Sequence, residues 1–151
     1  MVLLGGAALF CTALGAQSTG VLSVASPEKL RVPRTGTVTQ KLKCSLQPGY
    51  HANSDKPNDE YLIPMKLTWD KGSVDAVSVT FPKPTLEKSE FSEKPLSVYT
   101  GSFEIATQFK RAAGAKLGPG LLTGKLRYQA CNDKMCLPPK TIDVKVPLLV
   151  E

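Results

Sequence analysis

The stretch TVTQKLKCSL, residues 37–46, alternates apolar and polar side chains along its length. Val38, Leu42 and Cys44 share one face of an extended chain, whereas lysine, serine and threonine side chains take the other. A period of two residues is typical of a β-strand with one buried and one solvated face. We therefore predict a strand over residues 37–46, in which Cys44 is a small buried hydrophobic residue.

Alternation of the same kind recurs along the chain, interrupted by turn signals. Five further runs are predicted as strands: residues 60–69, 73–81, 96–109, 121–130 and 141–150. The run at 96–109 changes register near Gly101, and no segment after residue 20 has the 3.6-residue apolar period of a helix. Many short strands separated by turns predict an all-β, immunoglobulin-like β-sandwich of about seven to nine strands.

Segments rich in turn residues separate these runs. Residues 47–59 are predicted as a turn-rich connection. Residues 82–95 are predicted as a long exposed loop, because they contain three prolines and six charged residues. Residues 17–35, rich in Ser, Thr, Gly and Pro, are predicted as a leader with at most one short strand. The single domain is therefore placed at residues 36–151.

The first sixteen residues, MVLLGGAALFCTALGA, contain no charged side chain. They are shorter than the roughly 20 apolar residues that cross a bilayer. They fit the apolar part of a secretory signal ending in small residues, although no lysine or arginine precedes it. We expect residues 1–16 to direct export to the periplasm, where disulfides form. No later segment is apolar enough to span a membrane, so we expect the mature domain not to do so.

The formal net charge is +6, but lysines and arginines are scattered among acidic residues. No basic stripe is interleaved with aromatic side chains, so the sequence does not indicate a nucleic-acid-binding protein. A basic surface of this kind favours acidic proteins or anionic lipid headgroups as partners.

The stretch YQACNDKMCLPPKT, residues 128–141, holds two cysteines between two predicted strands. Four residues separate Cys131 from Cys136, enough for a turn that brings their Cα atoms within the roughly 4.4–6.8 Å of a disulfide. Such a small ring stabilises a fold by only about 2 kcal/mol. Lys134 and Lys140 are expected to favour the thiolate. We interpret the pair as redox-active, with a structural disulfide as the alternative.

Metal binding is a further alternative for the cysteines. The chain has one histidine, His51, and two candidate soft donors, Met65 and Met135. A three-ligand site would require the 47–59 turn to meet the cysteine loop. We predict neither a metal nor a cofactor. Hydrolytic chemistry is not supported, because the sequence has no G-x-S-x-G motif.

Two segments resemble the N-terminal periplasmic domain family of the thiol:disulfide interchange protein DsbD. YQACNDKMCLPP, residues 128–139, resembles the cysteine motif of that family. PGYHANSDKPNDEYLIPMKLTW, residues 48–69, resembles its GYH–N–YLIP segment. The resemblance covers about residues 36–148. It implies an immunoglobulin-like sandwich, in agreement with the alternating pattern.

The resemblance also implies a function in thiol–disulfide exchange. Cys136 would form a mixed disulfide with a partner protein, and Cys131 would resolve it. The chain would be a component of a protein-disulfide reductase whose electron donor and acceptors are thioredoxin-like domain proteins. Because the sequence has no predicted transmembrane segment, a separate membrane-embedded reductase would supply the electrons. The rival functions are a binding or chaperone-like module with a structural disulfide, and a periplasmic metal carrier.

The resemblance implies a cap over the cysteines. EKSEFSEKP, residues 87–95, resembles the cap loop of the family, with Phe91 at the cap aromatic and Glu90 at an acidic position.

Tyr50, His51 and Asn53 complete the candidate site. His51 and Asn53 stand where the best-known family member has aromatic residues near its cysteines, and the cysteine loop here is one residue shorter. The sequence leaves open whether His51 acts as an acid or base near the thiols or is a hydrogen-bonded turn residue.

Overall fold

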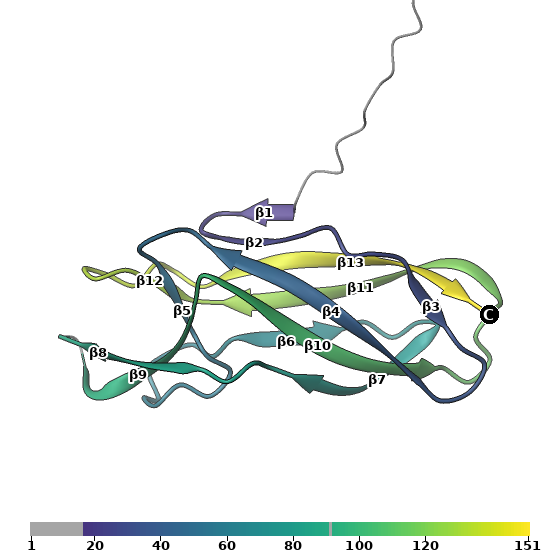
Figure 1. Cartoon of the computed structure of the whole chain (residues 1–151), viewed down its shortest axis with the longest axis horizontal. Helices are drawn as coiled ribbons and strands as arrows, with labels where there is room; N and C mark the ends of the chain where they lie inside the picture. The colour runs from purple at the N-terminus through teal and green to yellow at the C-terminus, as the bar shows by residue number, and fades with distance from the viewer. Residues whose placement is uncertain (1–16, 91) are drawn as a thin grey trace, which may run out of the picture.

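The computed structural model describes residues 17–90 and 92–151 of the chain. The expected secretory signal, residues 1–16, and the expected cap aromatic, Phe91, lie outside the described residues. The described residues form 13 strands and no helix, and the molecule is elongated (Figure 1). Within them, no helix is long and apolar enough to cross a membrane.

Two sheets face each other and form the body of the molecule (Figure 1). The five-stranded sheet has the order β1 (Gln17–Thr19), β2 (Leu22–Val24), β4 (Thr37–Leu46), β10 (Ser102–Arg111), β7 (Val74–Thr80). The four-stranded sheet has the order β3 (Leu30–Val32), β13 (Lys140–Val150), β11 (Gly118–Tyr128), β6 (Lys66–Trp69). All neighbouring strands are antiparallel except β3 and β13, which run parallel. The fold is an immunoglobulin-like β-sandwich, as predicted, but the described residues form 13 strands where about seven to nine were expected.

A third sheet, which we call the end sheet, lies at the end of the molecule opposite the C-terminus (Figure 1). Its four strands have the order β12 (Ala130–Cys131), β5 (His51–Asn53), β9 (Ser92–Thr100), β8 (Thr85–Ser89). Three of these strands continue strands of the body: β5 follows β4, β9 precedes β10, and β12 follows β11. The end sheet therefore extends both layers of the sandwich.

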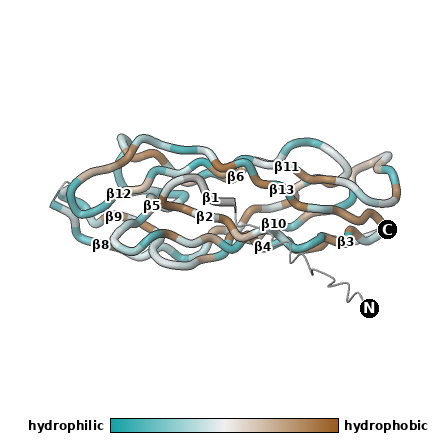
Figure 2. Tube along the Cα trace, turned by 90° about the horizontal axis from the view of Figure 1, so that it is seen from above, coloured by the Kyte–Doolittle hydropathy of each residue, from teal (hydrophilic) through white to brown (hydrophobic). Residues whose placement is uncertain are grey.

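Alternating burial along the long strands builds the core between the two body sheets. In β4 the buried residues are those of the predicted apolar face, including Leu42 and Cys44. The same alternation is visible as changes between brown and teal along β4, β10, β11 and β13 (Figure 2). Leu126 and Val144 are fully buried in the opposite layer.

Trp69 connects the two body sheets. Its ring centroid lies 5.2 Å from that of Phe109 at an interplanar angle of 74°. Its Nε1 donates a hydrogen bond to Oγ1 of Thr107 over 3.0 Å, which satisfies a fully buried hydroxyl. A Cβ at Gly124, the register partner of Trp69, would lie 2.5 Å from the indole, so only glycine fits beneath the ring.

The prediction for residues 17–35 is wrong in its strand content. This segment contains β1, β2 and β3, whereas at most one short strand was expected. Leu22, Val24 and Val32 are fully buried in the core. The strands escape the alternation signal because each has only three residues.

The prediction of a long exposed loop at 82–95 is also wrong, because β8 and the first part of β9 form a hairpin there. The prolines are compatible with it: Pro84 precedes β8, and Pro95 lies in β9 close to a register shift in the pairing. Proline is tolerated at strand ends and bulges. The charges are compatible as well, since β8 is an edge strand with a mostly solvated surface.

Three other boundaries differ from the predictions. The strand expected at 60–69 is confined to Lys66–Trp69, because Pro64 cannot donate to a ladder. The turn-rich segment 47–59 contains the short strand β5. The register change near Gly101, whose φ is 60°, is the point at which the chain passes from the end sheet to the body.

Candidate redox site

The two cysteines face each other across the hairpin that follows β12, and they form a disulfide with a Cα–Cα distance of 3.9 Å. The backbone N–H of Asn132 donates to the carbonyl of Met135, and that of Leu137 donates to the carbonyl of Ala130. These bonds flank the cysteines and leave them as a non-hydrogen-bonded antiparallel pair, the pair type with the closest Cα atoms. The separation is therefore shorter than the sequence suggested.

Asn132 shapes the tip of this hairpin. Its Oδ1 accepts hydrogen bonds from the backbone N–H groups of Lys134 and Met135, both over 2.9 Å. An asparagine side chain that bonds to the backbone two or three residues ahead stabilises a tight turn. These bonds therefore stabilise the turn in addition to the disulfide.

The two cysteines differ in exposure. Cys131 is 3% exposed, because it belongs to β12 and pairs with His51 of β5. Cys136 lies after the turn and is exposed. Met135 beside it is 56% exposed, and Pro138 and Pro139 are exposed as well. The disulfide is therefore open to solvent on the side of Cys136.

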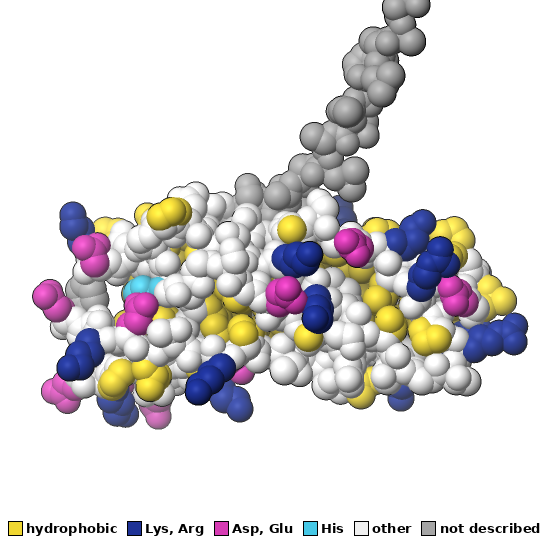
Figure 3. All heavy atoms as spheres, viewed as in Figure 1, with side chains coloured by type: hydrophobic (Ala, Val, Ile, Leu, Met, Phe, Trp, Pro, Cys, Tyr) yellow, Lys and Arg dark blue, Asp and Glu magenta, His cyan; other side chains and the backbone are white. Residues whose placement is uncertain are grey.

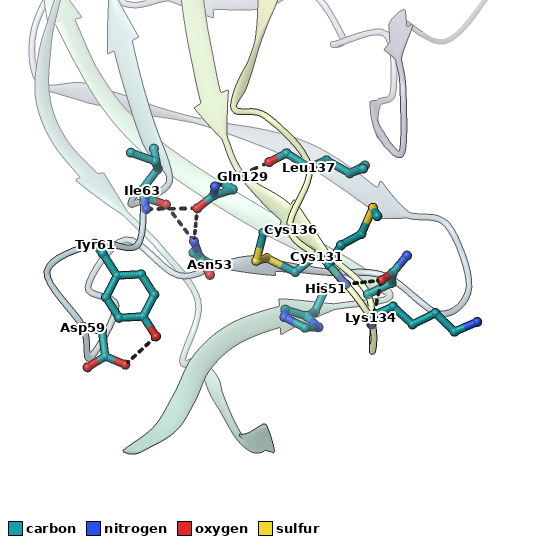
Figure 4. Close-up of a disulfide and its surroundings, with 12 residues drawn as sticks. His51, Asn53, Asp59, Tyr61, Ile63, Gln129, Cys131, Lys134, Cys136 and Leu137 are labelled. Carbon is teal, nitrogen blue, oxygen red and sulfur yellow. Dashed lines mark hydrogen bonds between the residues drawn. A yellow bond between two sulfur atoms is a disulfide. The ribbon is translucent and has the colours of Figure 1, made fainter. Parts of the chain in front are cut away.

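The lysines expected near the sulfurs point elsewhere. The side chain of Lys134 extends away from the disulfide (Figure 4). The Nζ of Lys140 lies over Gly20, where it would be 2.7 Å from a Cβ at that position. Neither lysine is thus directed at the cysteine pair.

His51 lies next to the disulfide, between β12 and β9 in the end sheet (Figure 4). Its side chain is 14% exposed, and its Nδ1 is 3.9 Å from Oε2 of Glu87 on β8. Burial lowers the pKa of His51 below its usual 6.5, and the negative charge of Glu87 partly opposes this shift. The 47–59 segment therefore meets the cysteine hairpin, the condition that the sequence left open.

Asn53 is fully buried and connects three segments around the site (Figure 4). Its Nδ2 donates to the carbonyl of Ile63 and to Oε1 of Gln129, over 3.1 and 3.0 Å. Gln129 also accepts from the N–H of Ile63 and donates to the carbonyl of Leu137. This network fixes the base of the cysteine hairpin against the YLIP segment. Gln129 was not among the predicted site residues, and its only signal in the sequence is its place two residues before Cys131.

Tyr50 and Glu90 occupy the edges of the candidate site. Tyr50 is half-buried against the core and lines a shallow hollow together with His51 and Glu87. Glu90 is exposed in the turn between β8 and β9. The structure therefore brings Tyr50 beside His51, whereas Glu90 makes no contact with the cysteines that the structure defines.

The β8–β9 hairpin is held in place by the segment that follows β5. Tyr99 donates to Oδ1 of Asp55 over 2.6 Å, and Ser92 donates to Oδ2 of Asp59 over 2.5 Å. Burial and the bond to Asp55 raise the pKa of Tyr99. The hairpin thus has a defined position from which Glu87 reaches His51.

Cys44 is remote from this chemistry. It is a free thiol, 2% exposed, in the core face of β4. Burial raises its pKa to about 12, so it remains a protonated thiol at neutral pH. The prediction of a buried hydrophobic residue is confirmed.

The described residues contain no group of three or more His, Cys, Asp or Glu side chains placed to hold a metal ion. Charged side chains of both signs are interspersed over the face of the molecule shown in Figure 3.

Together these features define an immunoglobulin-like β-sandwich domain with a disulfide that is open to solvent on one side. The chain belongs to the family of the N-terminal domain of the thiol:disulfide interchange protein DsbD, whose model matches residues 20–148. The match begins within the segment predicted as a leader, in agreement with the place of β2 and β3 in the sheets.

A solved structure supports the fold. The N-terminal periplasmic domain of ScsB from Proteus mirabilis matches with a TM-score of 0.60 and 17% identity, over 86% of this chain and 49% of that one. The chain therefore spans about half the length of that structure. The reduced N-terminal domain of DsbD from Neisseria meningitidis matches with a TM-score of 0.49 and 19% identity, over 71% of this chain and 74% of that one. A search of curated proteins finds no match.

Proposed function

We propose that this chain is a periplasmic module that exchanges disulfides with partner proteins through Cys131 and Cys136. Membership of the DsbD N-terminal family supports thiol–disulfide exchange in general. The observation that carries the proposal for these two residues is their unequal exposure, 3% at Cys131 against the exposed Cys136.

The unequal exposure supports different roles for the two sulfurs. In the reduced protein the Cys136 thiolate attacks a partner disulfide, forms a mixed disulfide and releases one partner thiolate. The Cys131 thiolate then attacks Sγ of Cys136 and releases the second partner thiolate, so the partner gains two electrons and the cysteine pair loses them. In the opposite direction a partner thiolate attacks Sγ of Cys136 and expels Cys131 as the leaving thiolate.

A purely structural role is less compatible with the geometry. The disulfide joins residues only five positions apart and closes a ring that stabilises the fold by about 2 kcal/mol. The backbone bonds on either side of the pair already define the hairpin. The disulfide also connects no two sheets, in contrast to a bridge that holds a sandwich together.

Thioredoxin-like domain proteins are the proposed donors and acceptors, with a separate membrane-embedded reductase as the source of electrons. The support is family membership together with a surface beside Cys136 formed by Met135, Pro138 and Pro139, which are all exposed. A partner whose own cysteine projects from its surface fits this arrangement.

The reduction potential of the cysteine pair tests the proposal. We expect a value above about −300 mV in glutathione or dithiothreitol buffers, since structural disulfides generally lie below that value. A Cys131→Ser variant, which keeps the exposed sulfur, should accumulate a stable mixed disulfide with a thioredoxin-like protein, and a Cys136→Ser control should not. A potential well below −300 mV would show that the disulfide is structural.

A further inference from the structure

Three buried side-chain atoms among the described residues have no hydrogen-bond partner: Oε1 of Gln40, Nε2 of His51 and Oδ1 of Asn53. Two of the three belong to β5, the strand that pairs with β12 and its Cys131. A buried polar atom without a partner is uncommon in a folded protein, and each one calls for an explanation. For Nε2 of His51 the explanation lies in the neighbouring Cys131, whose thiol must lose a proton when it reacts.

His51 lies directly opposite Cys131 in the end sheet. His51 is the antiparallel register partner of Cys131, so the two side chains project from the same face of the end sheet. Directly opposite residues have Cβ atoms about 4.5–5.5 Å apart, within reach of an imidazole and a sulfur. The His51 ring lies beside the disulfide in Figure 4.

The charged and titratable groups around His51 determine which of its nitrogens can accept a proton. The titratable groups that face His51 are Glu87 from β8, Tyr50 from the preceding turn and Cys131 from β12. Its partner on β9, Thr100, does not titrate. The Glu87 carboxylate lies 3.9 Å from Nδ1, and its negative charge favours the neutral tautomer with the proton on Nδ1. The buried Nε2 then presents a lone pair.

The buried Cys131 thiol needs a nearby base in order to lose its proton. A Cys131 thiolate has almost no contact with water, because the residue is 3% exposed. A thiol in such a place loses its proton readily only to a nearby base. Lys134 extends away from it, and the Nζ of Lys140 lies over Gly20. Since burial lowers the pKa of His51, the imidazole is neutral and able to accept a proton at neutral pH.

We propose that His51 is the proton acceptor for Cys131 and that Glu87 positions its imidazole for this task. This inference rests on the proposed exchange function and assigns a role within it. The Cys131 thiol transfers its proton to Nε2 of His51 and attacks Sγ of Cys136 in the mixed disulfide. The partner sulfur leaves as a thiolate, and the imidazolium returns the proton to that thiolate or to water.

A small disulfide reagent separates this step from partner binding. Reduced protein releases one thionitrobenzoate from 5,5′-dithiobis(2-nitrobenzoate) when Cys136 reacts and a second when Cys131 closes the ring. We expect His51→Gln to slow the second release at pH 7 by on the order of tenfold, the effect of a one-unit shift in thiol pKa. The first release should change by less than about twofold, and the pH profile of the second should move to higher pH. Cys44 does not interfere, because it is buried and protonated.

Matched variants identify the contribution of Glu87. Glu87→Gln should slow the second release in the same direction but by less than His51→Gln. Glu104→Gln, which removes an exposed carboxylate on β10, should have no effect. A second release in His51→Gln that stays within twofold of the wild type across the pH range would overturn the proposal.

NMR spectra provide a second test, which does not depend on the folding of the His51 or Glu87 variants. His51 is the one histidine of the chain, so its imidazole resonances are unambiguous in NMR spectra. We expect the His51 titration to differ between the reduced wild type and reduced Cys131→Ser, because only the former has a thiol that shares the proton. Identical titrations would overturn the inference. This measurement involves no partner, so a protein with a low reduction potential and a coupled His51 would contradict the exchange function alone.

Discussion

The body of the sandwich and its end sheet are built on different principles. In the body, β11 and β13 pair over 11 residues, and an apolar core lies between the layers. In the end sheet, β12 has two residues and β5 has three, and fully buried Asn53 and Ser54 are among its interior groups. Long apolar strands define the fold, and the fold leaves one end free for polar groups and a disulfide.

Cys136→Ser is expected to have the largest effect, a loss of disulfide exchange with little loss of stability. Loss of the exposed sulfur should reduce disulfide exchange with a thioredoxin-like protein to the background rate, because no other described thiol is accessible. The free energy of unfolding should fall by no more than about 2 kcal/mol, the contribution of the small ring. Enzyme-coupled exchange and urea denaturation measure the two quantities. Retention of wild-type exchange would refute the role of Cys136.

Phe109→Ala, in the body, is expected to lower stability and leave the redox chemistry unchanged. Phe109 is fully buried and packs against Trp69, so its truncation should cost about 3–5 kcal/mol of stability. The reduction potential of the cysteine pair should stay the same, because Phe109 lies in β10 and its ring packs against Trp69 of β6, both in the body. Leu86→Ala, at a residue 64% exposed on β8, is the control and should change stability little. A shift in potential with Phe109→Ala would show that the regions are coupled.

Sequence analysis predicted the body well and the end sheet poorly, and strand length explains why. Alternation over ten residues reveals β4, including the buried Cys44, without any knowledge of its partners. Three-residue strands such as β5 carry no periodic signal, and they form because longer neighbours supply the backbone partners. The β8–β9 hairpin was missed for a related reason, since its charges and prolines are tolerated at an edge.

The residues of the candidate site also fall into those that the sequence indicated and those that it did not. The sequence and the family resemblance indicated the cysteine pair and the residues after Tyr50, because motifs and spacing are local. Gln129 and Glu87 were missed, because their importance comes from contacts with Asn53 and His51 across the sheet. No spacing rule in one sequence connects residues so far apart in the chain.

A smaller effect is expected from Gln129→Ala, which sharpens the comparison at the base of the hairpin. The substitution leaves the buried Nδ2 of Asn53 with one acceptor fewer and should cost about 1–3 kcal/mol. Gln108→Ala, at an exposed position of β10, is the matched control and should be nearly neutral. Urea denaturation of the oxidised proteins measures both. Equal stabilities of the two variants would show that the network contributes little.

The smallest effect concerns pH. Burial lowers the pKa of His51 below 6.5 in the folded protein, so the unfolded chain binds a proton more readily. This contribution to stability is present above pH 6.5 and is lost as the pH falls toward the folded pKa. The decrease in unfolding free energy between pH 7.5 and 5 should therefore be smaller in oxidised His51→Gln than in the wild type. Equal decreases would contradict the burial effect.

Trp69 has a practical consequence for all of these experiments. It is the one tryptophan of the chain and contacts Phe109 and Thr107 between the body sheets, at a distance along the sandwich from the cysteine hairpin. Its fluorescence should follow the integrity of the body and stay constant when the disulfide opens and closes. Trp69 fluorescence thus reports folding and does not respond to the redox state of the cysteine pair. Folding and redox state can therefore be monitored in the same sample.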